Sequence, residues 1–132
     1  EALKLMASKG GIVGVTVIAP FLKKGDASTV EDYVDAISYT VDLVGLDHVG
    51  VGTDFTQDQP EEFWKYIGSQ QGTKFPSTFT DVTTPANYPI NFETPDKFPV
   101  LIDTMESKGF SREEVAKILG LNWIRVFQEV WK

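Results

Sequence analysis

The chain has 132 residues, of which 42% are hydrophobic and 23% charged, a composition typical of a globular domain. Its net charge of −7 argues against nucleic acid as a partner, because phosphate recognition requires clustered lysine and arginine. No apolar run approaches the ~20 residues that span a bilayer, and the lack of cysteine excludes disulfides and thiolate metal sites. We therefore expect a soluble protein without a membrane-spanning segment in this chain. A cytoplasmic location is expected as well, although the lack of cysteine says little about compartment.

The first two predicted elements are a short helix and a strand. Apolar residues between positions 2 and 6 form one face of a helix, and Gly10 and Gly11 end it because glycine accepts the left-handed conformation at a helix C-terminus. Residues 12–18 are nearly all apolar and β-branched, which favours a strand buried on both faces, as in a parallel sheet.

A long amphipathic helix is predicted between this strand and a second one. Ser28 and Glu31 have the spacing of a capping box, apolar residues then recur at helical spacing to about Val44, and Gly45 closes the helix. Residues 49–53 form a second short apolar strand. A strand, a helix and a strand in this order make a right-handed βαβ unit, so the predicted fold class is α/β.

Residues 56–95 show no sustained periodicity apart from a short helix predicted around residues 61–67. This region is rich in proline and in aromatic residues. A disordered linker would lack those rings, so we expect an ordered functional loop. Because it follows a strand of a parallel sheet, the loop is predicted to cover the site at that end of the sheet.

Helices are predicted to close the chain over residues 99–132. Ser111 and Glu114 form a capping box at the start of one of them, and Gly120 is expected to end that helix. Asn122 is then expected to cap the last helix of the chain.

The strongest local signal for chemistry is Asp54, which follows the apolar strand directly. In parallel α/β folds the C-terminal ends of the strands are where active sites collect. Gly50 and Gly52 are predicted to leave room beside the strand, as a bound metal or substrate requires. On this motif alone, the alternative that Asp54 only caps the next element stays equally open.

Other site types fit the sequence less well. His48 begins the strand that Asp54 ends, and at ~3.3 Å per residue they stand about 20 Å apart, so His48 is predicted to be structural. A dinucleotide-binding loop would need a third glycine and a helix start that are absent here. An EF-hand loop is disfavoured because Gln59 stands where glycine is required. With a single histidine and no cysteine, the chain cannot build a histidine-rich zinc site by itself.

Four segments are weak signals one by one, but their order and spacing in the chain make them specific as a set. They are Leu46-Asp47-His48-Val49-Gly50-Val51-Gly52-Thr53-Asp54-Phe55, Phe98-Pro99 at a helix start, Ser111-Arg112-Glu113-Glu114-Val115, and Leu119-Gly120-Leu121-Asn122-Trp123-Ile124-Arg125-Val126-Phe127. In these segments the chain resembles the membrane (renal-type) dipeptidase family of the amidohydrolase superfamily, and the resemblance covers essentially the whole chain.

The resemblance implies a TIM-like (β/α)8 barrel that uses zinc to cleave dipeptides with a free C-terminal carboxylate. It implies that residues 12–18 and 49–53 are the last two strands, so that the chain is the C-terminal segment of the barrel. Asp54 then matches the catalytic aspartate that acts as base on the attacking water. Phe21 and Phe55 are the substrate-binding residues that the resemblance predicts.

The chain departs from the family pattern in two places. Many members continue Asp-Phe-Asp-Gly, whereas this chain has Thr56-Gln57 after Phe55. The family's metal-binding histidines, its His-x-Asp motif, its bridging glutamate and its substrate-binding arginine are expected upstream of Glu1, which is not an initiator methionine. No metal ligand is therefore assigned within this chain.

Two expectations about partners follow. A typical barrel needs ~250 residues, so we expect this segment to associate with the upstream half, on the same precursor or a separate chain, and to form an oligomer. The alternative function is a non-catalytic binding or oligomerisation module derived from a barrel end.

Overall fold

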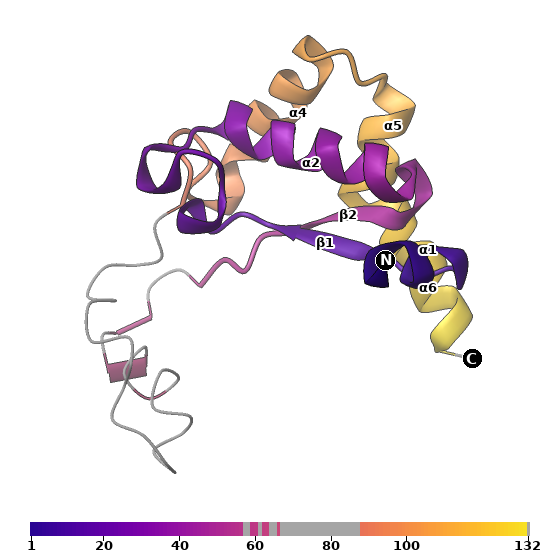
Figure 1. The fold of residues 1–132 in the computed structure, drawn as a ribbon. Helices are drawn as coiled ribbons and strands as arrows, with labels where there is room; N and C mark the ends of the chain where they lie inside the picture. Colours follow the sequence, from indigo (N-terminus) through magenta and orange to yellow (C-terminus); the bar gives the residue numbers. More distant parts are fainter. Residues whose placement is uncertain (57–58, 61, 64–65, 67–87, 132) are drawn as a thin grey trace.

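The computed structural model describes residues 1–56, 59–60, 62–63, 66 and 88–131 (Figure 1). Two strands, β1 (Val13–Thr16) and β2 (Val49–Gly52), pair in parallel, with Val13 opposite Val49 and Thr16 opposite Gly52. Helix α2 (Val30–Val44) connects them and lies along one face of the pair (Figure 1). The predicted βαβ unit is confirmed, although both strands are shorter than the apolar runs that predicted them.

The hydrophobic core lies between the strand pair, α2 and α4 (Phe98–Ser107). On α2, buried side chains recur every three to four residues, which is the pattern expected of a helix with one face in the core. Tyr33 is fully buried there, and its Oη donates a hydrogen bond of 2.8 Å to the carbonyl oxygen of Val15. The other fully buried apolar side chains of this cluster are Val17, Val30, Val34, Ile37, Val49, Phe92, Leu101, Met105 and Ile118.

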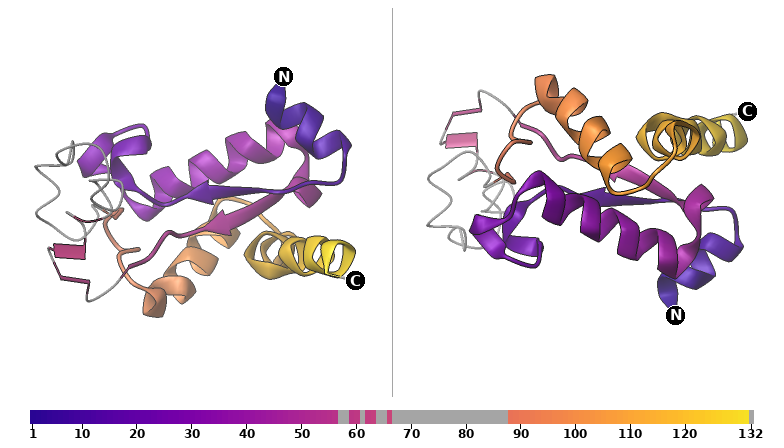
Figure 2. Two further views of the ribbon diagram at one scale, coloured as in Figure 1. Left: turned by 90° about the horizontal axis from the view of Figure 1, so that it is seen from below. Right: turned by 90° about the horizontal axis from the view of Figure 1, so that it is seen from above.

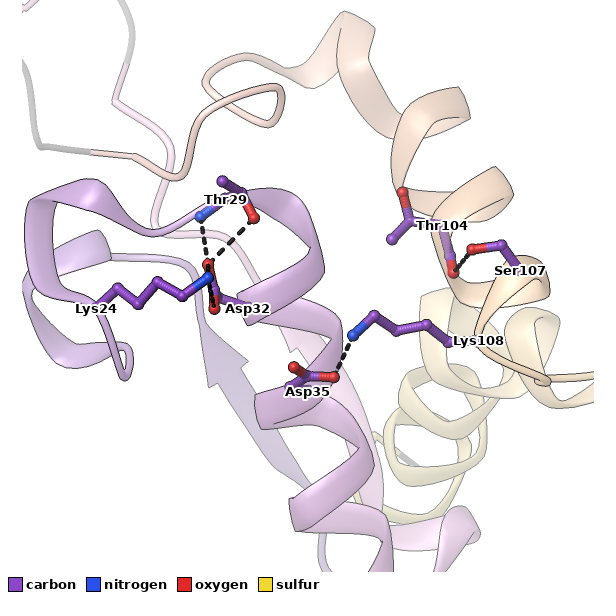
Figure 3. Close-up of polar contacts among 7 residues, drawn as sticks. All are labelled: Lys24, Thr29, Asp32, Asp35, Thr104, Ser107 and Lys108. Carbon is purple, nitrogen blue, oxygen red and sulfur yellow. Dashed lines mark hydrogen bonds and ion pairs between the residues drawn. The ribbon is translucent and has the colours of Figure 1, made fainter.

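The cap of α2 differs from the prediction by one residue. The N-cap is Thr29, and the Asp32 carboxylate accepts hydrogen bonds from the Thr29 backbone N–H at 2.9 Å and from its hydroxyl at 3.1 Å (Figure 3). The prediction of Ser28 with Glu31 is therefore wrong. The reason is tertiary: the Ser28 carbonyl oxygen accepts from the Ile90 N–H at 2.9 Å, which holds Ser28 outside the helix.

Asp32 should stabilise the protein only above acidic pH. The hydrogen bond from Lys24, followed by that from the Thr29 N–H, holds the pKa of the Asp32 carboxyl below its ordinary value. The stabilisation is thus present above about pH 4 and is lost as the pH falls through the lowered pKa. We expect Asp32→Asn to lower the free energy of unfolding by about 0.5–2 kcal/mol at pH 7.

Denaturant unfolding of both proteins at pH 7 and pH 3 checks this prediction. The gap between wild type and Asp32→Asn should shrink at pH 3. Asp103→Asn, at an exposed position of α4, is the matched control and should change stability by less than about 0.5 kcal/mol at either pH. An equal gap at both pH values would contradict the titration of Asp32.

Helix α4 packs beside α2, and Gly109 follows its end in the left-handed region at a φ of 100°. At this end Lys108 forms an ion pair with Asp35 of α2 (Figure 3). The predicted capping box follows: the Ser111 Oγ accepts from the Glu114 N–H at 3.3 Å, and the Glu114 carboxylate accepts from the Ser111 N–H at 2.8 Å.

The end of the chain is one continuous helical segment. It consists of α5 (Arg112–Ala116), a π-helical turn (Lys117–Leu121) and α6 (Asn122–Val130). Gly120 lies inside the π-helical turn, so the prediction that it ends a helix is wrong. Asn122 does not cap a helix either, because its buried Nδ2 donates to the carbonyl oxygens of Leu46 and Val49, at 2.8 Å each.

Arg125 of α6 reaches the turns that precede both strands. Its Nη1 donates to the carbonyl oxygen of Gly10 at 2.8 Å, and its Nη2 donates to that of Asp47 at 2.9 Å. Together with Asn122, this side chain fixes the end of the strand pair at which both strands begin. Helix α1 (Ala2–Ser8) and α6 lie at that same end (Figure 2).

Strand β1 is less buried than its sequence predicts. All of its residues, 13–16, are half-buried, although burial on both faces was expected. The reason is that, in the part of the chain that the structure describes, β1 pairs with β2 along one edge only. Its second edge carries no strand there.

Candidate active site at the C-terminal edge of the strand pair

Asp54 and Phe21 lie at the same end of the strand pair, the C-terminal edge at which both strands finish. Asp54 follows β2 after one intervening residue and is exposed to solvent. Phe21 ends a 3-10 helix, Ala19–Phe21, that follows β1, and its side chain is 75% exposed. Because β1 and β2 are parallel, the chain leaves both strands at one end of the pair (Figure 1). The structure thus brings an exposed carboxylate and an exposed ring to the edge where sites of parallel folds form.

The backbone of Asp54 adopts a left-handed conformation, with a φ of 53°. The side chain of Tyr88 bridges this turn: its Oη donates to the carbonyl oxygen of Asp54 at 2.8 Å and accepts from the N–H of Thr56 at 3.2 Å. One hydroxyl therefore uses both its donor and its acceptor capacity on the peptide groups that flank Phe55.

Phe55 packs toward the core. Its half-buried ring meets the ring of Tyr88 edge-on with centroids 5.0 Å apart, and meets the ring of Phe92 at 5.3 Å. Phe92 is itself fully buried and stacks on Tyr33 at 5.6 Å. Aromatic packing on the core thus accounts for Phe55, and its predicted contact with substrate stays a prediction.

His48 lies at the opposite end of β2 from Asp54, as predicted. It ends the 3-10 turn Leu46–His48 before the strand, and its Nδ1 lies 2.8 Å from the carbonyl oxygen of Gly11. Across the described ranges, from 1–56 to 88–131, no three potential ligands among histidine, aspartate and glutamate side chains lie close enough to hold a metal ion. The donors that the structure places at this edge do not by themselves fit a zinc centre.

The space beside Gly50 is filled by protein. A Cβ atom at Gly50 would lie 2.9 Å from Cε2 of Trp123, and one at Gly14, its register partner, would lie 3.1 Å from Cζ2 of the same indole. The prediction that Gly50 leaves room for a metal or substrate is therefore wrong. Gly52 has close backbone neighbours as well, since its Cβ would lie 3.1–3.3 Å from backbone atoms of Gly14.

Two residues that shape this region were not predicted from the sequence. In the sequence Tyr88 is one of the aromatic residues of the long loop, and Trp123 belongs to a segment of the family resemblance. The Nε1 of Trp123 donates to the carbonyl oxygen of Val51 at 3.1 Å, which fixes the indole across the glycines. For Trp123 the available signal was Gly50, because glycine inside a strand marks a close approach of another group.

Part of the predicted active-site loop lies outside the described residues. These are residues 57–58, 61, 64–65 and 67–87, which include most of the short helix predicted around 61–67. The role of the loop as a cover of the site stays a prediction. In the described remainder of the chain, no helix combines the length and apolar character needed to cross a membrane.

Comparison with known proteins identifies relatives over nearly the whole chain. Dipeptidase ataJ of Aspergillus terreus is 27% identical over 98% of this chain and 26% of its own length. An amidohydrolase crystal structure from Pseudomonas aeruginosa is 41% identical, with a TM-score of 0.87, over 98% of this chain and 39% of that one. A Rhodobacter sphaeroides metallopeptidase, liganded with a phosphinate mimic of the dipeptide L-Ala-D-Ala, has the same fold at 20% identity and a TM-score of 0.70, over 98% of this chain and 30% of that one.

The chain thus spans between 26% and 39% of the length of these relatives. Its mixed helix and strand fold is similar to that of the amidohydrolase and metallopeptidase structures it matches. The model of the family described as membrane dipeptidase (peptidase family M19) matches residues 1–66, which is half of the chain. The resemblance seen in the sequence is confirmed, and the chain belongs to the membrane dipeptidase family.

Proposed function

We propose that this chain is the C-terminal segment of a metal-dependent dipeptidase barrel and that it supplies one catalytic carboxylate. The observation that carries the proposal is Asp54, exposed at the C-terminal edge of a parallel strand pair in a member of the membrane dipeptidase family. Strand β1 is half-buried and, within the described residues, pairs along one edge only. Its open edge supports the proposal, because a strand from elsewhere in the barrel could pair there.

Asp54 is proposed to act as the general base of peptide hydrolysis. Its carboxylate takes a proton from the water that attacks the peptide carbonyl carbon and gives that proton to the departing amine nitrogen. Phe21, exposed at the same edge, is proposed to contact the substrate through its ring. Phe55 is proposed to line the same site from the core side, next to Asp54.

The metal, expected to be zinc, would be held by residues outside this sequence. Family membership supports the metal, and the described residues contain no group of three histidine, aspartate or glutamate side chains that could hold it. The partners of the chain are then the dipeptide substrate and the upstream half of the barrel. An oligomer is the expected form where that half is a separate chain, because that chain then has to cover the open edge of β1.

Assays of two proteins test this proposal. The full-length protein that contains this chain should hydrolyse dipeptides and carry about two metal ions per barrel, since enzymes of this type activate water with paired metals. The purified 132-residue chain should bind no zinc tightly and hydrolyse no dipeptide, because one aspartate cannot hold a two-metal centre. Absence of turnover in the metal-loaded full-length protein would disprove the proposal. Turnover by the isolated chain would disprove the placement of the metal ligands outside this sequence.

A binding or oligomerisation module remains the second candidate, and one observation favours it. Helix α6 and its flanks expose apolar side chains, including Leu121, Ile124, Val130 and Trp131 at 50–75% exposure. Exposed apolar patches of this kind mark contact surfaces. Metal analysis separates the two candidates, because the module requires no bound metal.

A further inference from the structure

The left-handed backbone of Asp54 needs an external support. A residue other than glycine at a φ of 53° is strained, although aspartate tolerates this region better than most residues. Such a conformation persists only where the surrounding structure fixes it. The direction of the Cα–Cβ bond of Asp54 depends on this φ, so whatever fixes the backbone also sets the direction in which the side chain leaves the chain.

Tyr88 is the side chain that bridges this turn. Its hydroxyl joins the carbonyl oxygen of Asp54 to the N–H of Thr56, at 2.8 and 3.2 Å, and it also lies 3.4 Å from Oγ1 of Thr56. The peptide group that follows Asp54 and the next one along the chain are therefore held by a single oxygen atom.

The segment that carries Tyr88 is itself fixed to α2. The Ile90 N–H donates to the carbonyl oxygen of Ser28 at 2.9 Å, and the Val30 N–H donates to that of Ile90 at 3.0 Å. The ring of Tyr88 packs edge-on against Phe55, at 5.0 Å. The segment that carries the Tyr88 hydroxyl is thus held by backbone hydrogen bonds at Ile90 and by the ring contact with Phe55.

We infer that Tyr88 is a positioning residue of the active site, which holds the Asp54 backbone in its left-handed conformation and thereby orients the catalytic carboxylate. The inference rests on the proposed function, in which Asp54 is the general base. Tyr88 acts through Asp54 and does not touch the reacting atoms. Losing its hydroxyl should therefore affect the chemical step and leave substrate binding nearly unchanged.

The test compares Tyr88→Phe with Tyr33→Phe in the full-length protein. Each substitution removes one hydroxyl that donates to a backbone carbonyl at 2.8 Å, but the Tyr33 hydroxyl binds Val15 in the core. Tyr88→Phe should lower kcat about 10–100-fold with KM and metal content within about twofold of wild type. Tyr33→Phe should leave kcat per folded molecule within about twofold, whatever it costs in stability.

A double mutant supplies the decisive readout. In an Asp54→Asn background, Tyr88→Phe should cause no further loss of kcat, because there is no base left to orient. Unchanged kcat in Tyr88→Phe, an additive loss in the double mutant, or failure of Tyr88→Phe to fold would each overturn the inference. If Asp54→Asn itself keeps full turnover, the proposed function fails instead, so the two failures are distinguishable.

Discussion

Replacing Asp54 by asparagine in the full-length protein is expected to lower kcat about 10²–10⁴-fold, with little change in KM. Asparagine keeps the size and shape of the side chain and also tolerates the left-handed φ of 53° found at this position. It cannot accept a proton from the attacking water. The loss should therefore come from proton transfer and not from a disturbed turn.

Metal analysis and denaturant unfolding of the same variant supply the controls. If Asp54 served mainly as a metal ligand, Asp54→Asn would lose metal before it lost turnover. If Asp54 only capped a turn, the variant would be less stable by roughly 0.5–2 kcal/mol and fully active when folded. An active Asp54→Asn enzyme would thus disprove the catalytic role.

Substituting Gly50 by alanine should destabilise the protein by about 1–3 kcal/mol, the usual cost of overpacking a core. The added Cβ would lie 2.9 Å from Cε2 of Trp123 and 3.0 Å from Cδ1 of Ile12. The indole cannot move away freely, because its Nε1 donates to the carbonyl oxygen of Val51. The free energy of unfolding of the full-length protein, from denaturant titration, measures the effect.

Gly120→Ala is the matched control for this substitution. A Cβ at Gly120 meets no atom within 4 Å, and the residue lies in the helical segment. Alanine there should leave stability unchanged or raise it by about 0.5–1 kcal/mol, because alanine loses less backbone entropy than glycine in a helix. Equal losses at Gly50 and Gly120 would show that packing against Trp123 is not the cause.

The βαβ unit could be predicted because its signals are local. A run of β-branched residues and a 3.6-residue periodicity in α2 require no knowledge of distant contacts. The capping box of α2 could not be placed correctly in this way. Whether Ser28 or Thr29 becomes the N-cap depends on pairing with Ile90, a residue far along the chain. The same holds for Asn122, whose partners Leu46 and Val49 lie more than 70 residues before it.

The position of Asp54 could likewise be predicted, but not its conformation. A carboxylate after an apolar strand is visible in the sequence, whereas a left-handed φ at a residue other than glycine has no sequence signature. Tyr88 was missed for this reason, because its function depends on that conformation.

The contacts of Arg125 and Asn122 bear on the order in which the protein folds. Arg125 contacts Gly10 across 115 positions of the sequence, and Asn122 contacts Val49 across 73. During synthesis, residues 1–52 leave the ribosome well before Asn122 and Arg125 are added. The two strands therefore lack these hydrogen bonds until the end of the chain is made. Bringing such distant positions together is slow because loop-closure entropy is lost before the contact forms. A nascent chain that stops short of Arg125 therefore has the beginning of both strands without the side chains that hold it, and incompletely packed strands of this kind are prone to aggregation.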